Sequence, residues 1–266
     1  MNLELLWEQE GLPSFELPAA LAELHPGTIG FDGPRVFANF VETVDGVVAI
    51  PSVEQSNRLI AAGNPADRFV MGLLRACADA VMVGSGTMAA SPGGLWTAAQ
   101  AYPDAATLFA ALRRSRGLPP EPEVAILSAS GVIDTSHPVF EAGALLITTD
   151  IGAKLLGGDL PPAATLVSLG PGVEVDPTAA LGIMRARGHE LVLHEGGPHV
   201  IGSFFEAGVV DELFLTVSPL LTGRSLIDPR FALVEGADLL PGTTLRLLSA
   251  RRETDHLFLR YAILPR

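Results

Sequence analysis

The sequence predicts an α/β protein with a mostly parallel central sheet, helices on both faces and an antiparallel C-terminal edge. Two observations lead to this fold class. From residue 35 to about residue 217, short apolar runs typical of buried strands alternate with segments that repeat apolar residues at helical spacing. The last two apolar runs, 245–251 and 257–263, are separated only by a short turn, as antiparallel neighbours are.

Residues 1–34 are predicted to be an N-terminal extension ahead of a single domain at residues 35–266. Pro13, Pro18 and Pro26 interrupt this stretch. A proline inside a helix removes a hydrogen bond and clashes with the preceding turn. We therefore expect no long helix here, but an arm that packs on the domain or on a partner subunit.

The elements of the domain follow in chain order. Strands are expected at 36–41, 80–83, 124–127, 145–149, 166–169, 191–193 and 213–217, ahead of the two C-terminal strands. Helices are expected from Pro65 to about Cys77 and over 105–114, 178–187 and 199–206. Pro65 suits a first helical turn, and Gly188 is a typical stop signal after a helix.

Composition excludes several classes of function. Hydrophobic residues make up 48% of the chain, enough for a sizeable core, and the net charge of −13 repels a nucleic-acid backbone. A single cysteine, Cys77, excludes a disulfide framework and a cysteine-based zinc site. No apolar run approaches the roughly 20 residues that span a bilayer, and the acidic N-terminus does not fit a signal peptide. We expect a cytoplasmic protein without nucleic-acid or membrane partners.

Two glycine-rich junctions each join a strand to a helix. Gly84-Ser85-Gly86-Thr87 follows the strand at 80–83, and Gly196-Gly197-Pro198 follows the strand at 191–193. Glycine lets a phosphate approach the backbone, and a helix N-terminus attracts anions. We interpret the pair as two ends of one pyrophosphate site or two sides of one cleft. Short connections without a ligand are the alternative.

Charged residues stand at three places that need an explanation. Arg75 lies among apolar residues of its predicted helix, and a charge near a buried face needs a partner or a ligand. A salt bridge to Asp79 is the alternative to a ligand. Glu195 lies at the carboxyl end of a strand, where open α/β sheets bind ligands. The basic group that begins at Arg113 is expected to be a solvated helix face or a phosphate contact.

No metal site is expected. His194 and His199 are five residues apart, whereas the zinc-binding helix motif needs four, and the Gly-Gly-Pro between them prevents a helix.

Taken together, these segments resemble the pyrimidine reductases of riboflavin biosynthesis, whose domain has the dihydrofolate-reductase fold. The resemblance covers about residues 36–263. It rests on ordered motifs, which are Thr43-Val44-Asp45-Gly46, Leu74-Arg75-Ala76, Val83-Gly84-Ser85-Gly86-Thr87, Glu195-Gly196-Gly197-Pro198 and Val210-Asp211-Glu212-Leu213.

The resemblance implies a homodimeric reductase that transfers hydride from NADPH to a ribosylaminopyrimidine 5′-phosphate. It implies that Glu195 and Asp45 orient the substrate or relay a proton. The substrate-binding residues that it implies are Arg75, Asn39, Ser56 and Leu95. The cofactor-binding residues that it implies are Gly84, Gly86, Thr87, Ser128, Gly196, Gly197, Pro198, His199, Val200, Ile201 and Gly202.

Two positions depart from the family pattern. Asn39 stands where the family commonly has a lysine, and Leu95-Trp96-Thr97-Ala98 stands where an arginine usually follows the loop. Both changes remove positive charge that would hold a phosphorylated sugar. A dihydrofolate reductase on the same fold and a non-catalytic NADP-binding paralogue are therefore the alternative functions.

Overall fold

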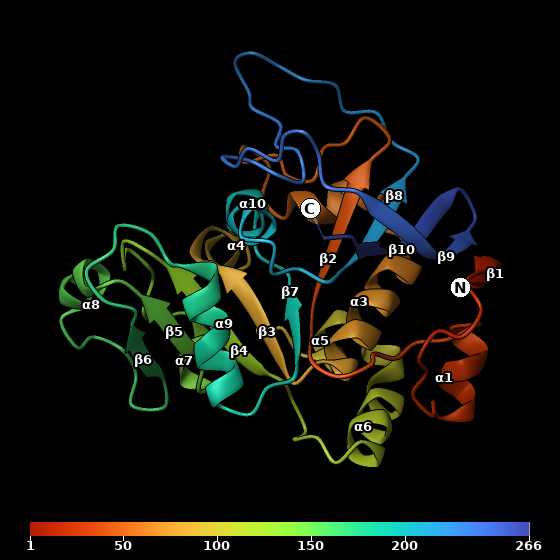
Figure 1. The fold of residues 1–266 in the computed structure, drawn as a ribbon, viewed down its shortest axis with the longest axis horizontal. Coiled ribbons are helices and arrows are strands. Elements are labelled where there is room, and N and C mark those ends of the chain that lie inside the picture. The colour runs from red at the N-terminus through yellow and green to blue at the C-terminus, as the bar shows by residue number, and fades with distance from the viewer. Residues whose placement is uncertain (266) are drawn as a thin grey trace.

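The computed structural model describes residues 1–265. Within these residues, one ten-stranded sheet runs through the molecule in the order β1-β9-β10-β8-β2-β7-β3-β4-β5-β6 (Figure 1). The strands are β1 (Glu4–Glu8), β2 (Arg35–Thr43), β3 (Ala80–Gly84), β4 (Glu123–Ser128), β5 (Leu145–Thr148), β6 (Thr165–Ser168), β7 (Leu191–His194), β8 (Glu212–Ser218), β9 (Leu245–Glu253) and β10 (His256–Ile263).

The sheet divides into a parallel part and an antiparallel part. Neighbouring strands from β8 through β2 to β6 are parallel, whereas β10 pairs antiparallel with both β8 and β9. This confirms the predicted mostly parallel sheet with an antiparallel C-terminal edge. The strand that the sequence did not predict is β1, which pairs antiparallel with β9 at the outer edge.

Four longer helices lie where the sequence predicts them, and several short ones join the remaining elements. The longer helices are α3 (Pro65–Cys77), α6 (Ala106–Ser115), α9 (Pro177–Ala186) and α10 (Pro198–Glu206). The short ones are α1 (Ala19–Leu24), α2 (Ser56–Ile60), α4 (Ser85–Ala89), α5 (Ala98–Ala101), η1 (Pro103–Ala105), α7 (Pro138–Glu141) and α8 (Asp150–Leu156). Across residues 1–265, no helix combines the length and the apolar character needed to cross a bilayer.

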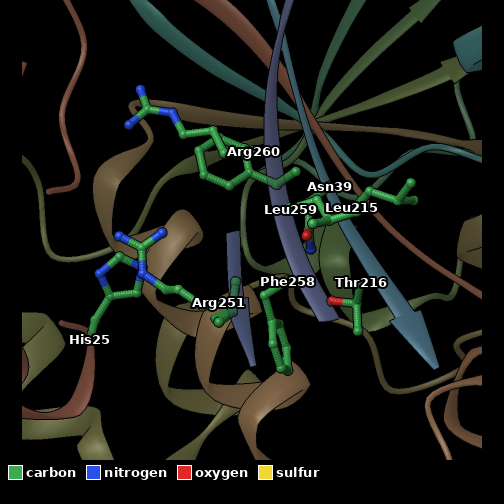
Figure 2. Close-up of a pocket in the computed structure, with 10 residues that line it drawn as sticks. His25, Asn39, Leu215, Thr216, Arg251, Phe258, Leu259 and Arg260 are labelled. Atoms are coloured by element: carbon green, nitrogen blue, oxygen red, sulfur yellow. The ribbon is translucent and has the colours of Figure 1, made fainter. Parts of the chain in front are cut away.

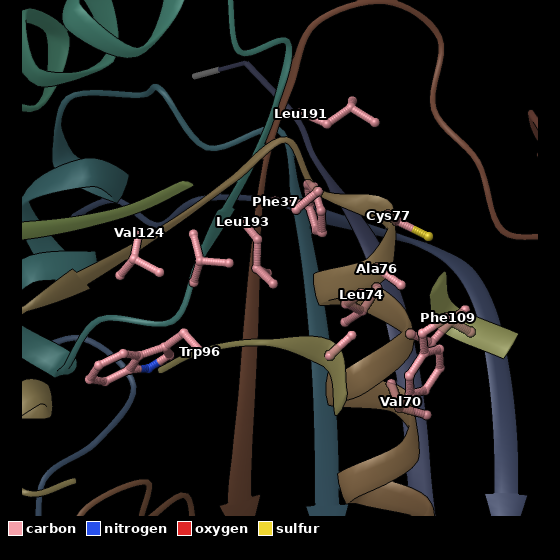
Figure 3. Close-up of a cluster of buried hydrophobic side chains, with 14 of the residues drawn as sticks. Phe37, Val70, Leu74, Ala76, Cys77, Trp96, Phe109, Val124, Leu191 and Leu193 are labelled. Carbon is pink, nitrogen blue, oxygen red and sulfur yellow. The ribbon is translucent and has the colours of Figure 1, made fainter. Parts of the chain in front are cut away.

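The helices cover the sheet from both faces because strand side chains alternate between them. On one face, Phe37 and Leu193 of the strands pack with Leu74 of α3 and Phe109 of α6 (Figure 3). On the other face, strand residues pack with α9 and α10. Helix α3 begins where the sequence predicts, because Asn64 accepts hydrogen bonds from the first free N–H groups of the helix.

The N-terminal extension packs on the sheet of its own chain. Arg251 of β9 donates to the Pro26 carbonyl at 2.7 Å and to the Glu8 carboxylate at 2.9 Å. Arg260 of β10 donates to the Gly30 carbonyl at 2.7 Å. Both arginines are buried, so these contacts hold the extension against the antiparallel part of the sheet.

A small cavity lies between α3 and the antiparallel strands. His25 and Arg251 line it on one side, and Asn39 and Thr216 line it on the other (Figure 2). Its volume of about 20 Å³ accommodates about one water molecule. The cavity is therefore too small to be a substrate site, although it adjoins one of the predicted substrate-binding residues.

Candidate active site

A buried ion pair lies where α3 meets the carboxyl ends of the central strands. Arg75, in the last turn of α3, donates to Glu195 Oε2 through Nη2 at 2.7 Å and through Nε at 3.0 Å. The two side chains are only 9% and 7% exposed. Glu195 directly follows β7, and the register of β2 with β7 places Asn39 beside it. The Asn39 amide approaches Glu195 Oε1 at 3.5 Å. The structure thus brings together three residues that the sequence predicted.

The alternative salt bridge between Arg75 and Asp79 is wrong. Helix α3 ends at Cys77, so Asp79 no longer lies one helical turn above Arg75. Its carboxylate instead accepts the backbone N–H groups of Glu190 and Leu191, at 2.6 and 2.7 Å. Asp79 therefore fixes the start of β7, and Arg75 is left to pair with Glu195.

The pairing leaves one carboxylate oxygen of Glu195 available. The third guanidinium nitrogen of Arg75 donates to the Thr97 carbonyl at 3.2 Å, so each nitrogen of this guanidinium has an acceptor within the protein. Glu195 Oε2 is occupied by Arg75, whereas Oε1 has only the long contact with Asn39. The arrangement therefore presents a fixed acceptor whose charge is balanced by a buried cation.

Arg113 binds the C-terminal end of α3, next to Arg75, which the sequence analysis did not predict. Its guanidinium is buried and donates to the carbonyls of Arg75 at 3.1 Å, Ala78 at 2.7 Å and Pro119 at 2.7 Å. The expected solvated face or phosphate contact is therefore wrong for this residue. Carbonyl groups at a helix C-terminus lack partners within the helix and attract cations, and Arg113 satisfies that demand at the end of α3.

Asp67 is a second buried carboxyl group that the sequence analysis missed. It lies in the first turn of α3 and forms a hydrogen bond with Thr216 of β8. Burial raises its pKa to about 6, although the hydrogen bond from Thr216 acts in the opposite direction. An acid three residues after Asn64 is typical of an ordinary helix cap, so no pattern in the sequence indicated that this carboxyl group would be buried.

The two glycine-rich junctions lie side by side, as interpreted from the sequence. Strands β3 and β7 are parallel neighbours, so both junctions begin at the same edge of the sheet. A Cβ atom on Gly84 would lie 2.7 Å from Val200, and one on Gly196 would lie 3.1 Å from the Gly84 nitrogen. A Cβ on Gly197 would lie 3.3 Å from the Thr87 hydroxyl. Close packing between the junctions therefore requires glycine at Gly84 and Gly196.

Gly86 has a different reason to be glycine. A Cβ atom there would meet no protein atom within 4 Å among the residues described. Among residues 1–265, no side chain caps the N-terminus of α4 or that of α10. Open space beside uncapped N–H groups suits the approach of phosphate oxygens. The junction therefore fits the pyrophosphate of a dinucleotide.

The cofactor-binding candidates in α10 differ in how exposed they are. His199 is exposed and its ring packs edge-on against Phe231, whereas Pro198 is buried. Ile201 is fully buried in the core, and a Cβ atom on Gly202 would lie 2.7 Å from the Glu235 carbonyl. These last two positions therefore serve packing within the chain.

Ser128 ends β4 at the same edge of the sheet. Its hydroxyl is buried and has no hydrogen-bond partner within residues 1–265, and its carbonyl accepts from the Thr148 hydroxyl at 2.6 Å. The free hydroxyl fits a contact with a bound group.

His194, the last residue of β7, shapes the second junction. Its Nδ1 accepts the Gly196 N–H at 3.2 Å, which requires the neutral ring. Burial lowers its pKa to about 3. Throughout residues 1–265, no group of three His, Cys, Asp or Glu side chains is placed to hold a metal ion.

Asp45 lies in the turn that follows β2. Its carboxylate accepts from the Thr43 hydroxyl at 2.5 Å and from the N–H groups of Gly223 and Thr222, at 2.7 and 3.3 Å. The Thr43 hydrogen bond and these N–H groups hold the pKa of Asp45 below its usual range. Asp45 therefore ties the turn after β2 to the loop after β8.

Ser56 and Leu95 make local contacts. The Ser56 hydroxyl accepts the Ile50 N–H at 3.1 Å and so shapes the turn before α2. The Leu95 N–H donates to Gln100 at 2.7 Å, in the loop whose Thr97 carbonyl contacts Arg75.

Comparisons with known proteins agree with this architecture. The sequence model of the family described as the RibD C-terminal domain matches residues 34–255. The fold is similar to that of a pyrimidine reductase-like protein from Corynebacterium diphtheriae, with a TM-score of 0.71 and 22% identity over 88% of this chain and 93% of that one. It is also similar to the riboflavin biosynthesis reductase Rib7 of Saccharomyces cerevisiae, with a TM-score of 0.60 and 15% identity over 93% and 96% of the two chains.

A bifunctional protein shares the fold as well. The diaminohydroxyphosphoribosylaminopyrimidine deaminase/5-amino-6-(5-phosphoribosylamino)uracil reductase of Thermotoga maritima has a TM-score of 0.61 and 20% identity. The match covers 87% of this chain but 57% of that one. No curated protein sequence matched the chain. The expected α/β fold class, with its mostly parallel sheet and antiparallel C-terminal edge, is confirmed, and these proteins share the fold.

Proposed function

We propose that this chain, which belongs to the RibD C-terminal domain family of riboflavin-biosynthesis reductases, reduces a ribosylaminopyrimidine 5′-phosphate with NADPH. The substrate would receive hydride at its ribosyl carbon, which opens the sugar to a ribityl chain. The observation that carries the proposal is the position of the Arg75–Glu195 pair directly beside the two glycine-rich junctions.

The glycine-rich junctions would hold the cofactor. NADPH supplies the hydride when it is bound. The backbone around Gly86 and the N-terminus of α10 would bind its phosphates, because both places offer N–H groups without a side-chain cap among residues 1–265. The Thr87 hydroxyl of the first junction lies close to Gly197 of the second, and the free hydroxyl of Ser128 would contact the 2′-phosphate end.

Glu195 would orient the substrate. Its Oε1 is held in place by the contacts of Oε2 with Arg75, so it can accept an N–H group of a pyrimidine without moving. Glu195 also directly precedes Gly196, so the substrate would lie next to the cofactor phosphates. Fixing both reactants in one geometry is the main contribution that a protein makes to hydride transfer.

Asn39 and Arg75 both contact Glu195 and would assist it, while Asp45 would act through the turn and the loop that it joins. Arg75 would work through the carboxylate, because each of its three guanidinium nitrogens already donates to an acceptor of the protein. Asp45 would contribute by holding the turn after β2. We also include in the proposal the homodimer and the cytoplasmic location that the family resemblance implies.

One observation favours dihydrofolate as a second candidate substrate. Arg75 is paired with Glu195, and Asn39 carries no charge, so neither offers a free cation to a 5′-phosphate. A substrate without a phosphate near this pair would lose less from the missing charge.

The test is oxidation of NADPH by the purified protein in parallel with the two acceptors. Turnover with the ribosylaminopyrimidine phosphate supports the proposed function. Turnover with dihydrofolate alone makes the protein a folate reductase. Binding of NADPH without turnover of either acceptor would contradict the proposal and would leave a reductase with a different substrate or a non-catalytic NADP-binding paralogue.

A further inference from the structure

Two arginines of helix α3 share one face of the helix but differ in how their guanidinium groups are occupied. Arg68 and Arg75 are two helical turns apart, or about 10 Å along the axis. Arg75 is buried, and all three of its guanidinium nitrogens have acceptors. Arg68 is exposed, and it donates through Nε to the Ala101 carbonyl at 3.0 Å and through Nη2 to the Gln100 carbonyl at 3.1 Å. Its Nη1 has no hydrogen-bond partner among residues 1–265, so Arg68 keeps donors for a ligand.

Both arginines hold the short helix α5, which lies against α3 (Figure 1). Arg75 donates to the carbonyl of Thr97, the residue that precedes α5. Arg68 donates to the carbonyls of the last two residues of α5. Helix α5 therefore runs from the occupied guanidinium beside Glu195 to the guanidinium that has free donors.

A third cation, Arg58, lies close enough to act on Arg68. Burial lowers the pKa of Arg68, and the positive charges of Arg75 and Arg58 lower it further. The carboxylates of Asp67 and Glu195 oppose this effect, but the charge of Glu195 is already balanced by Arg75. Arg58 is exposed in α2, and its guanidinium has neither a hydrogen bond nor an ion pair among residues 1–265. An anion that binds to Arg58 and Arg68 would relieve their mutual repulsion.

The composition of the chain makes these two unpaired arginines informative. Acidic side chains outnumber basic ones by 30 to 17, yet within residues 1–265 neither Arg58 nor Arg68 forms an ion pair with one. A guanidinium group binds a phosphate or a carboxylate through two parallel N–H groups. The two arginines therefore offer the charge and the donors that such an anion needs.

We propose that Arg58 and Arg68 bind the anionic end of the substrate, which in the proposed reaction is the 5′-phosphate. This inference rests on the proposed function, in which Glu195 holds the pyrimidine. The phosphate lies at the far end of the ribosyl group from the pyrimidine, just as Arg68 lies two helical turns from Arg75. The two arginines would supply the positive charge that Asn39 and the paired Arg75 do not offer.

The test measures binding by calorimetry and steady-state turnover for two acceptors, the ribosylaminopyrimidine 5′-phosphate and the same compound without its phosphate. Arg58→Gln and Arg68→Gln should each weaken binding of the phosphorylated acceptor about tenfold and raise its KM as much, with kcat unchanged. Affinity for the acceptor without phosphate should not change. Arg58→Gln removes no contact within residues 1–265, so its result does not depend on a repacked fold. Arg114→Gln is the matched control, since Arg114 is an exposed arginine of α6 and should behave as the unchanged protein.

The outcomes separate this inference from the proposed function. Variants that match Arg114→Gln, or that lose affinity equally for both acceptors, would refute the anion site alone. A phosphorylated acceptor that binds through these arginines but is not reduced would refute the proposed function and support the site. An unchanged protein that binds neither acceptor would refute both. An effect confined to dihydrofolate, whose glutamyl tail carries carboxylates, would overturn the assignment to a phosphate.

Discussion

Two buried arginine–glutamate pairs on the same face of the sheet differ in how completely the carboxylate of the glutamate is satisfied. In the antiparallel part, Arg260 donates to both oxygens of Glu212, at 2.7 and 3.2 Å, and to the Gly30 carbonyl. In the parallel part, Arg75 occupies one oxygen of Glu195 and leaves the other beside Asn39. The chemistry of the two pairs is the same, so their surroundings decide what each pair does.

The surroundings follow from the topology. Arg260 lies over the rings of Phe31 and Phe214, and its partner Glu212 is the first residue of β8, at the amino end of that strand. Glu195 lies at the carboxyl end of β7, where parallel strands bring two glycine-rich junctions together. The first pair therefore joins parts of the fold, and the second presents an acceptor at the edge where α/β sheets bind ligands.

Removing Arg260 should have the largest effect. Arg260→Ala leaves Glu212 buried without its cation, which should lower the free energy of unfolding by about 3–5 kcal/mol. Denaturant unfolding measures this loss. Turnover per folded molecule should be unchanged, because Arg260 does not contact the candidate site. A variant that kept its stability but lost turnover would reverse the roles assigned to the two pairs.

Asp67 should make stability fall as pH rises from about 4 to about 6. Its pKa is about 6 in the folded protein, against 3.8 as its ordinary value. Between these values the unfolded chain loses the proton while the folded protein keeps it, so the unfolded state binds fewer protons and stability decreases. The loss should be about 1–3 kcal/mol, from the free energy of one pKa unit.

Denaturant unfolding at several pH values checks this prediction. Asp67→Asn keeps an oxygen for the Thr216 hydroxyl but does not titrate, so this variant should lack the decrease. Equal pH profiles for the two proteins would show that Asp67 is not the group responsible.

Gly86→Val should have a smaller effect, confined to the cofactor. A Cβ atom at this position meets no protein atom within 4 Å outside the backbone of its own helix, so the fold should tolerate valine, which would occupy the space beside the N-terminus of α4. NADPH affinity should fall about tenfold, or about 1.4 kcal/mol. Gly182→Val is a matched control, since Gly182 is also a helical glycine with open space around it, in α9. Fluorescence titration with NADPH should distinguish the two variants, and equal affinities would remove Gly86 from the cofactor site.

Most of the regular structure could be predicted from the sequence, because periodic apolar patterns report directly on burial. Strands β2 to β10 and helices α3, α6, α9 and α10 all lie where these patterns place them. Strand β1 was missed because its exposed Leu5, Leu6 and Trp7 have no alternation, and its pairing with β9 is decided by residues some 240 positions away.

The polar contacts were harder to predict than the elements. Arg75 pairs with Glu195, 120 residues away, whereas local spacing favoured Asp79. The neighbouring arginines predict that Arg113 lies on a basic surface, yet packing buries it against the end of α3. Local sequence shows the need for a partner, but only the strand order determines which partner is near. The family resemblance, by contrast, identified Arg75, Asn39 and Glu195 as one group, and the structure brings these three together.

We propose that the free oxygen of Glu195 serves the reaction, whereas Glu212 serves only the fold. The most direct measurement compares NADPH oxidation, with the ribosylaminopyrimidine phosphate as acceptor, for Glu195→Gln and Glu212→Gln. We predict that Glu195→Gln lowers turnover about 100-fold or more while NADPH still binds, and that Glu212→Gln loses stability but keeps turnover per folded molecule. Full turnover by Glu195→Gln would contradict the account.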